Sequence, residues 1–344
     1  MTDTWVSLPS ASIGSMDPDP LTPAALAAQA RRCGLVTQRE LAAGVVEVIG
    51  PLGRCQVGDG GGTYAVTTGR RPVGYVKVAA GHPGRLERER AVLTALAERD
   101  CAAEIVEGPR EDQLWTAVAG SRSVADVRGS MNDVLDLCQA WGAALGRLHT
   151  TPVRVSRTGG GRPPRARPWV LDRRTLVRTL AGEGPGPATD RRHWILACLE
   201  ESVELRLAAA EVAERWTAEH WVHGDLRLAQ VMVSEHGGPR VRFVGLGYGG
   251  LGDPAWDLAA AYDGLTAQAV VWGLPTTLTV EYFLQGYRHA GGPARLYPAM
   301  QAVHALAAAW QDAEADTASG AVTGWVAQGR VHAARTHGGW LTAA

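Results

Sequence analysis

The first third of the chain carries short apolar runs separated by turn residues. Strand-like runs cover residues 45–49, 64–68, 73–78 and 114–118. Glycine-rich or proline-containing turns at 58–62 and 69–72 separate the first three of these runs. Between the third and fourth runs, Leu86, Leu93 and Leu96 give residues 85–99 the apolar stripe of a helix. The pattern therefore predicts a small antiparallel sheet with one helix.

Helical periodicity dominates the rest of the chain. Apolar residues recur at three- and four-residue spacing from 132 to 149, which predicts a strong amphipathic helix. Further helical stretches cover about 190–216 and most of the chain after 255, with two short strand-like pieces at 231–233 and 241–244. Strands are thus concentrated in the first third and helices in the remainder, which is typical of an α+β protein.

The expected organisation has three parts. For residues 1–34 we expect an N-terminal leader that is partly helical, because within this segment only residues 23–32 have the alanine-rich composition of a helix. We expect an N-terminal lobe built on the small sheet at residues 35–120. We expect a larger, mainly helical C-terminal lobe at residues 121–344. An arginine-rich insert at 154–192 interrupts the helical pattern of the second lobe.

Net charge and hydropathy exclude several classes of protein. The formal net charge of the 344 residues is -1, so no overall field favours nucleic acid or an acidic membrane as a partner. No apolar run approaches the roughly 18 residues of a membrane span. The first residues lack the basic and apolar regions of a signal peptide, and we expect a cytoplasmic protein.

Lys77 is the single lysine among the 34 basic residues of the Lys and Arg types. A GC-rich genome would itself deplete lysine, so Lys77 could be a surface residue retained by chance. The alternative is that this position needs a compact ammonium, which a planar guanidinium does not imitate. Lys77 lies on the third predicted strand, in Tyr75-Val76-Lys77-Val78.

The most informative stretch runs from 221 to 259. It contains His223-Gly224-Asp225, Gln230 five residues later, Gly245-Leu246-Gly247, and then Gly252-Asp253-Pro254-Ala255-Trp256-Asp257-Leu258. This order and spacing resemble the catalytic segment of the aminoglycoside phosphotransferase and choline kinase superfamily, which is related to protein kinases. Lys77, Glu89 in Arg88-Glu89-Arg90, and Leu148-His149 match further motifs of that superfamily in the right order. The resemblance covers roughly residues 40–290.

The resemblance implies a kinase-like fold of two lobes and a role for each matched residue. Lys77 would hold the phosphates of ATP or another nucleotide, with Glu89 as its partner. Gly60, Gly61 and Gly62 would let backbone N–H groups approach the phosphates, although a glycine-rich turn is more often a plain hairpin turn. Asp225 would act as the catalytic base, while His223 is expected to hold the loop. Asp253 and Asp257 are expected to be structural, at a helix start and on the loop backbone.

Two positions depart from the superfamily pattern at the metal site. The usual asparagine is Gln230, which keeps a carbonyl oxygen on a longer side chain and is a weak candidate ligand. The usual aspartate is Gly245, which has no ligand, and residues 243–250 contain no acid. Mg²⁺ prefers hard oxygen donors in octahedral geometry. The sequence therefore does not favour Mg²⁺ binding, unless an acid from elsewhere or from a partner chain completes the site.

The insert at 154–192 has ten arginines and three acids, a difference of 10 − 3 = +7. It is either a solvated loop or an anion-binding surface for an acidic peptide, a phosphorylated group or a partner protein. The candidate contact residues are Arg162, Arg165, Arg167, Arg173 and Arg174. An arginine-rich surface argues against polycationic aminoglycosides as substrates.

Two functional hypotheses remain open at this point. The favoured one is an impaired, pseudokinase-like phosphotransferase that binds a peptide or partner protein, with or without nucleotide. The alternative is an active ATP-dependent kinase that phosphorylates a small-molecule hydroxyl or a peptide Ser or Thr, as superfamily members in ribosomal-peptide biosynthesis do. Gln230 and Gly245 support the first, whereas Lys77, Glu89 and Asp225 support the second.

Overall fold

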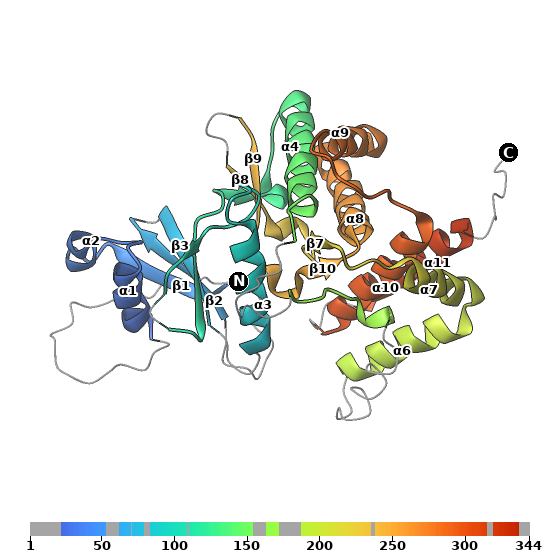
Figure 1. Ribbon diagram of the computed structural model, residues 1–344, viewed down its shortest axis with the longest axis horizontal. Coiled ribbons are helices and arrows are strands. Elements are labelled where there is room, and N and C mark those ends of the chain that lie inside the picture. Colours follow the sequence, from blue (N-terminus) through green and yellow to red (C-terminus); the bar gives the residue numbers. More distant parts are fainter. Residues whose placement is uncertain are drawn as a thin grey trace. The chain divides into compact units, whose positions relative to one another are not determined.

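A computed structural model of the chain describes residues 22–52, 62–69, 71–78, 83–108, 110–153, 163–171, 187–234, 238–314 and 319–336. The chain divides into two compact units (Figure 1). The first contains the chain up to Ser123 together with Met232–Gly247, and the second contains Val124–Val231 and Tyr248–Ala344. Each unit is described separately below.

The first unit is built on an antiparallel sheet in the order β1-β2-β3-β5-β4. Its strands are β1 (Val46–Leu52), β2 (Gly62–Thr68), β3 (Arg71–Val78), β4 (Ile105–Val106) and β5 (Gln113–Ala117). The hairpin β2–β3 places Thr63 opposite Lys77, and β5 places Leu114 opposite the same residue. Strand β3 therefore lies inside the sheet, hydrogen-bonded on both edges.

Helix α1 (Pro23–Arg32) belongs to the core of this unit. The Thr22 hydroxyl caps its first turn, and Pro23 occupies the first helical position, where its missing N–H is harmless. Leu26, which is fully buried, packs in one cluster with Val48 and Val76 of the sheet. A capping box at Thr37 begins the short helix α2 (Gln38–Ala42). Part of the segment expected to be a leader is thus an integral element of the sheet unit.

Helix α3 (Pro83–Leu96) follows β3 and contacts β4 and β5. A second small sheet in the order β6-β8-β9 contains β6 (Arg122–Ser123), β8 (Val231–Ser234) and β9 (Arg240–Phe243). Backbone hydrogen bonds join Phe243 to Cys101 and Ala103. These bonds explain why residues 232–247, which the sequence assigned to the helical lobe, belong to the first unit.

The second unit contains a closely packed helix pair, α4 (Met131–His149) and α9 (Thr276–His289). A Cβ at Gly142 would lie 1.9 Å from the carbonyl oxygen of Phe283, and a Cβ at Gly286 would lie 1.9 Å from that of Gln139. Real Cβ atoms do not approach backbone that closely, so glycine at both positions lets the helix backbones touch. His149 at the end of α4 is held deep inside the unit as a result.

A short sheet carries the segment that leads to the His-Gly-Asp motif. Strand β7 (His220–Val222) pairs with β10 (Gly250–Gly252). The extended segment 163–168 adds to β10, because Ala166 N–H donates to Leu251 and Leu251 N–H donates to Pro164. Between β7 and β10 in sequence lie two 3-10 turns, η3 (Leu228–Gln230) and η4 (Leu246–Tyr248).

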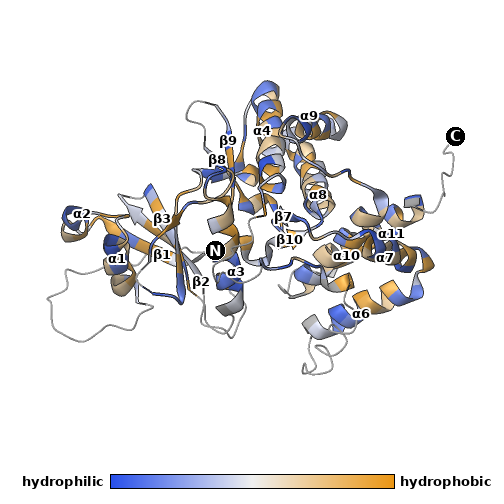
Figure 2. Cartoon of the chain, in the orientation of Figure 1, coloured by the Kyte–Doolittle hydropathy of each residue, from blue (hydrophilic) through white to orange (hydrophobic). Residues whose placement is uncertain are grey.

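The remaining helices of the second unit surround one apolar core. They are α6 (Pro187–Glu201), α7 (Val203–Arg215), α8 (Pro254–Trp272), α10 (Pro298–Glu314) and α11 (Ser319–Thr336). Buried Leu205, Val303 and Leu306 belong to this core, and Figure 2 shows both hydrophobic and hydrophilic residues along α7 and α10. Among the helices described, none is long and apolar enough to cross a lipid bilayer.

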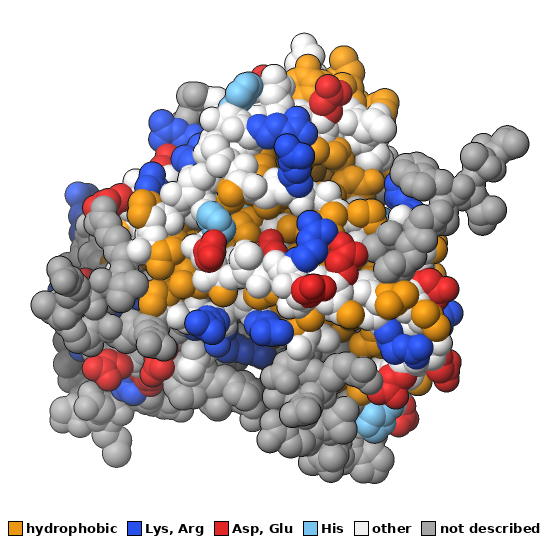
Figure 3. Space-filling model, turned by 45° about the vertical axis from the view of Figure 1, so that its right-hand side comes forward, with side chains coloured by type: hydrophobic (Ala, Val, Ile, Leu, Met, Phe, Trp, Pro, Cys, Tyr) orange, Lys and Arg blue, Asp and Glu red, His pale blue; other side chains and the backbone are white. Residues whose placement is uncertain are grey.

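The observed elements confirm the expected fold class. The sequence located β2, β3, β5, α3 and α4 to within a few residues of their observed bounds. It missed β4, β6, β7 and β10, which are strands of two or three residues and too short for a periodic pattern. Figure 3 shows basic and acidic side chains interspersed with apolar ones on the face that it draws.

Candidate active site

Lys77 and Glu89 form an ion pair inside the first unit. The Nζ of Lys77 lies 2.5 Å from Oε1 of Glu89, and 28% of the Lys77 side chain is exposed against 7% of Glu89. The strand neighbours Val76 and Val78 are buried in the core, so strand alternation turns Lys77 to the opposite face. The fold therefore holds an ammonium on the middle of a sheet, with the carboxylate of α3 beside it.

Helix α3 is fixed against the sheet one residue after Glu89. The Nη2 of Arg90 donates to the carbonyl oxygen of Gln113 at 2.7 Å, at the start of β5. Gly62 opens β2 opposite Val78. The other two glycines of the predicted phosphate loop, Gly60 and Gly61, lie outside the described residues.

The Gly245-Leu246-Gly247 segment ends beside this ion pair. A Cβ at Gly247 would lie 3.6 Å from Oε2 of Glu89, which is ordinary van der Waals contact. Gly245 has a φ of 80°, in the left-handed region where glycine carries no steric penalty. The segment that resembles Asp-Phe-Gly thus reaches the lysine and glutamate without bringing a carboxylate.

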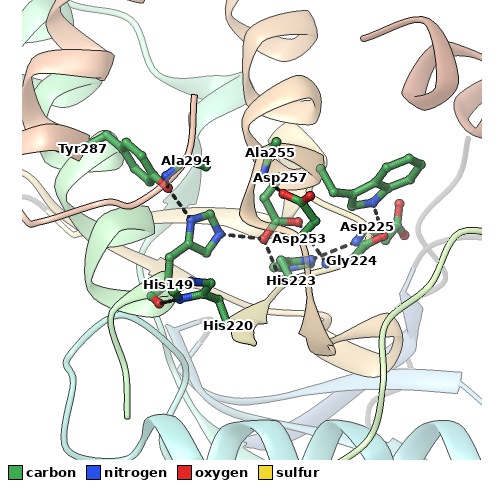
Figure 4. A network of polar contacts seen from close by, with 11 residues as sticks. His149, His220, His223, Gly224, Asp225, Asp253, Ala255, Asp257, Tyr287 and Ala294 are labelled. Atoms are coloured by element: carbon green, nitrogen blue, oxygen red, sulfur yellow. Dashed lines mark hydrogen bonds and ion pairs between the residues drawn. The ribbon is translucent and has the colours of Figure 1, made fainter. Parts of the chain in front are cut away.

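In the second unit, one buried carboxylate organises the His-Gly-Asp loop (Figure 4). Oδ2 of Asp257 accepts from the backbone N–H of His223 at 2.6 Å, and Oδ1 accepts from that of Gly224 at 3.0 Å. The Asp257 side chain is fully buried. Asp257 lies in the first turn of α8, where the exposed N–H groups of the helix favour a negative charge.

A relay of hydrogen bonds reaches Asp257 from the other side. Nε2 of His149 lies 3.1 Å from Oδ2 of Asp257, and Nδ1 of His149 lies 2.8 Å from the hydroxyl of Tyr287. Because the carboxylate only accepts, we assign the proton to Nε2, which leaves Nδ1 to accept from the Tyr287 hydroxyl. That hydroxyl accepts in turn from the N–H of Ala294 at 3.3 Å.

The pKa values of this network follow from burial and its hydrogen bonds. Burial by itself would raise the pKa of Asp257, but the hydrogen bonds from His149 and from the backbone N–H of His223, together with the electrostatic effect of these two residues, outweigh it and lower that pKa. Burial raises the pKa of Tyr287, which keeps its hydroxyl as a donor. Asp253 caps α8 through the N–H of Ala255 at 2.9 Å, and burial raises its pKa despite this bond.

The backbone at Gly224 requires glycine. Its φ is 81°, and a Cβ would lie 2.3 Å from the carbonyl oxygen of Tyr248. The carbonyl oxygen of Gly224 accepts from Nε1 of Trp256 at 3.0 Å. His223 is fully buried, and its Nδ1 accepts from the N–H of Asp225 at 3.3 Å. The loop is therefore fixed at three consecutive residues, of which the candidate base Asp225 is the last.

Asp225 is paired with a residue that the sequence analysis did not single out. Oδ1 of Asp225 accepts from Nε of Arg227 at 3.0 Å. Nη2 of Arg227 donates to Oε1 of Gln311, on α10, at 2.8 Å. The only sequence signal for the Asp225–Arg227 pair was the presence of an arginine two positions after the aspartate of the His-Gly-Asp motif.

The residues at the metal positions do not fit Mg²⁺. Oε1 of Gln230 accepts from the N–H of Arg227 at 2.9 Å and so closes the η3 turn. Gly245 offers no side chain, and within the described part of the chain no three His, Cys, Asp or Glu residues are grouped to hold a metal ion. Mg²⁺ needs several oxygen ligands, at least one of them usually a carboxylate.

Only part of the arginine-rich insert lies within the described residues. Arg165 and Arg167 are exposed on either side of buried Ala166, in the segment that adds to β10. In an extended segment, residues two apart point to the same side, so these two arginines share one side. The other candidates, Arg162, Arg173 and Arg174, lie outside the described residues.

Comparison with known proteins assigns the chain to a family. The phosphotransferase enzyme family matches residues 54–303, more than half of the chain. The chain belongs to this family. No curated protein sequence matches it significantly.

Solved structures of phosphotransferases share the fold of this family member. A thermostable mutant of aminoglycoside phosphotransferase APH(4)-Ia in its apo form is 15% identical with a TM-score of 0.53, covering 88% of this chain and 100% of that chain. Choline kinase LicA from Streptococcus pneumoniae is 14% identical with a TM-score of 0.52, covering 84% and 93%. Aminoglycoside phosphotransferase APH(3'')-Id from Streptomyces rimosus is 18% identical with a TM-score of 0.51, covering 75% and 93%. At these identities the likeness confirms the kinase-like fold.

Replacing Asp257 by Asn tests the buried network. Asn presents one N–H₂ group where the carboxylate accepts three hydrogen bonds, so Asp257→Asn should lower the free energy of unfolding by about 3 kcal/mol or more at pH 7. Asp257 has a lowered pKa in the folded state, so its contribution is complete above the unfolded pKa of about 4 and is lost as pH falls through the lower folded value. Urea unfolding from pH 7 to pH 3 measures both effects.

The control is Asp136→Asn on the exposed face of α4, which should change stability by less than about 0.5 kcal/mol. The difference in the free energy of unfolding between the wild type and Asp257→Asn should become smaller as the pH falls toward 3. A gap that stays constant over the whole pH range would contradict the assignment of a buried carboxylate to this network.

Proposed function

We propose that this phosphotransferase-family protein binds a nucleoside triphosphate through Lys77 and transfers its phosphate poorly. The observation that supports binding is the Lys77–Glu89 ion pair at 2.5 Å, made by the single lysine of the chain. Glu89 is almost buried, and it holds the ammonium in one place with part of its surface open to a ligand. A compact ammonium fixed in this way suits a phosphate oxygen.

The proposed impairment concerns the metal ion. Phosphoryl transfer depends mainly on positioning and on neutralising the charge of the phosphates, which metal ions normally do. Gln230 and Gly245 do not supply the ligands for it, as described above. Losing one such electrostatic contribution typically costs about 3–4 kcal/mol of transition-state stabilisation, or a factor of roughly 100 to 1,000 in rate.

Asp225 supports the second candidate function, an active ATP-dependent kinase. Its loop is fixed by Asp257, Trp256 and His223, which is the kind of preorganisation that a catalytic base needs. Substrates of such a kinase would be a small-molecule hydroxyl or a peptide Ser or Thr. Turnover measurements separate the two candidates directly.

The surface segment at 163–168 supports an anionic partner. Arg165 and Arg167 are exposed on one side of a segment that is hydrogen-bonded to β10, and β10 pairs with the strand leading to His223. Guanidinium groups bind carboxylates and phosphates in a bidentate manner. We propose an acidic peptide, either free or as part of a partner protein, as the ligand of this surface.

Nucleotide binding is tested by replacing Lys77. Lys77→Met should weaken the binding of ATP and of ADP by about tenfold or more, because a hydrogen-bonded charge contact of about 1.5–3 kcal/mol is lost. Isothermal titration calorimetry measures both affinities. Arg71→Met, an exposed cation on the same strand, is the matched control and should leave them unchanged. Equal affinities of the wild type and Lys77→Met for both nucleotides would exclude the proposed role of Lys77.

The impaired transfer is tested by restoring the missing carboxylate. Asp adopts a positive φ more often than most residues with a side chain, so Gly245→Asp should strain the local backbone less than most replacements. This variant should raise Mg²⁺-dependent ATP turnover at least tenfold over the wild type, and adding Asp225→Ala should remove the gain. A wild type that already turns ATP over at several per second, with dependence on Asp225, would favour the active kinase.

The anionic partner is tested by reversing the charge of the exposed pair. Arg165→Glu together with Arg167→Glu should weaken binding of a Glu-rich synthetic peptide at least tenfold and should leave ATP affinity unchanged. Fluorescence anisotropy in low salt measures the peptide affinity. The control is the double replacement Arg39→Glu and Arg240→Glu at exposed positions of the first unit. If the two double variants bind the peptide equally well, this surface is not its binding site.

A further inference from the structure

Arg227 is held at two points by neutral and acidic partners. Its Nε donates to Oδ1 of Asp225 at 3.0 Å, and its Nη2 donates to Oε1 of Gln311 at 2.8 Å. Its backbone N–H is engaged separately by Oε1 of Gln230 at 2.9 Å. A side chain with four rotatable bonds is thus fixed in one orientation, which removes most of the entropy that it would lose on binding a ligand.

This geometry leaves the Nη1 edge of the guanidinium for a ligand. A guanidinium carries five N–H donors in a planar fork, and the two contacts above use one on Nε and one on Nη2. The Arg227 side chain is 46% exposed, whereas that of Asp225 is only 11% exposed. The ion pair therefore presents its positive member outward over a carboxylate that lies below the surface.

Stability alone does not explain this arrangement. Ion pairs with one partner half-exposed contribute little to folding, typically about 0–1 kcal/mol. Burial opposes the charge of Arg227, but Asp225 and Asp312 outweigh burial and raise its pKa, so that Arg227 stays charged at any physiological pH. A permanent, fixed positive charge thus lies next to the candidate base.

We propose that Arg227 binds the terminal phosphate of a nucleoside triphosphate and supplies positive charge there in place of a metal ion. This inference rests on the proposed nucleotide binding. The group that orients the attacking hydroxyl must lie next to the phosphate being transferred, so a residue in contact with Asp225 faces the terminal phosphate rather than the inner ones.

Metal-independent binding follows from this assignment. An arginine needs no carboxylate ligands, and its N–H groups match the oxygens of a phosphate in a bidentate manner. The wild type should bind ATP with an affinity that changes less than about threefold between EDTA and Mg²⁺. ATP should bind more tightly than ADP, because only ATP has the terminal phosphate.

The test compares ATP with ADP in EDTA, using the full chain and isothermal titration calorimetry. Arg227→Gln should weaken ATP binding at least tenfold and ADP binding less than twofold, because one charged contact to the terminal phosphate is lost. The ATP affinity of Arg227→Lys should lie between those of the wild type and Arg227→Gln, because lysine keeps the positive charge but lacks the planar guanidinium that binds a phosphate through two N–H groups. Arg288→Gln, an exposed arginine of α9, is the matched control and should bind both nucleotides like the wild type.

A second variant separates direct binding from exposure of Asp225. Removing Arg227 uncovers the carboxylate, which would itself repel phosphate. The same comparison is therefore made in an Asp225→Asn background, where that repulsion is absent. If Arg227 binds the terminal phosphate, Arg227→Gln still weakens ATP binding at least tenfold in the Asp225→Asn background. If the double variant recovers the wild-type ATP affinity, the proposed role of Arg227 is wrong. Circular dichroism confirms folding, and Arg227→Lys serves if the Gln variant does not fold.

Tripolyphosphate distinguishes the failure of this inference from the failure of nucleotide binding. Equal ATP affinity of the wild type and Arg227→Gln, or wild-type ATP binding that is more than tenfold tighter with Mg²⁺, would overturn the role of Arg227 and leave nucleotide binding intact. If neither nucleotide binds but tripolyphosphate raises the Tm of the wild type and not of Arg227→Gln, the anion site stands without the nucleotide. If neither nucleotide nor tripolyphosphate binds, both proposals are wrong.

Discussion

The second unit depends on one buried negative charge, the carboxylate of Asp257. It accepts hydrogen bonds from the loop backbone at His223 and Gly224 and from the ring of His149. Asp257 lies in the first turn of α8, and through His149 and Tyr287 its carboxylate connects that helix to α4 and α9. An isolated carboxylate would be costly to bury, so these partners and the helix start are what allow it to stay charged. The position of the candidate base follows from the same bonds.

The sequence predicted those parts of the protein whose chemistry is local. Lys77 was placed on its strand by the apolar alternation around it, and the His-Gly-Asp motif was recognisable by residue type and spacing. The relay from His149 to Asp257 joins residues 108 positions apart, and no pattern along the chain reports such a contact. Strand β10 consists of two glycines and one leucine, so only its partner β7 reveals it as a strand. The proposed role of Arg227 depends on Gln311, which lies 84 positions away in the sequence.

The residues that resemble a phosphotransferase site fall into two chemical groups. Lys77, Glu89 and Asp225 are the residue types that the resemblance leads us to expect at their positions, and each has a defined ion-pair partner. At the metal positions, Gln230 closes a turn and Gly245 has no side chain. The residues of the first group would act through charges that are fixed on protein atoms. The residues of the second group would act only by binding a metal ion from solution. The contrast between these two groups is what the proposed function has to explain.

The segment 163–168 owes its position to main-chain hydrogen bonds with Leu251 and to the buried methyl group of Ala166. The side chains of Arg165 and Arg167 take no part in those backbone bonds. Their identity can therefore change during evolution or in the laboratory without moving the backbone that carries them. The surface side chains of this segment and the backbone of the loop at His223 are thereby subject to separate selection, although the segment is bonded to β10 and the loop follows β7 of the same two-stranded sheet. A surface of this kind can acquire a new ligand while the loop beside it stays the same.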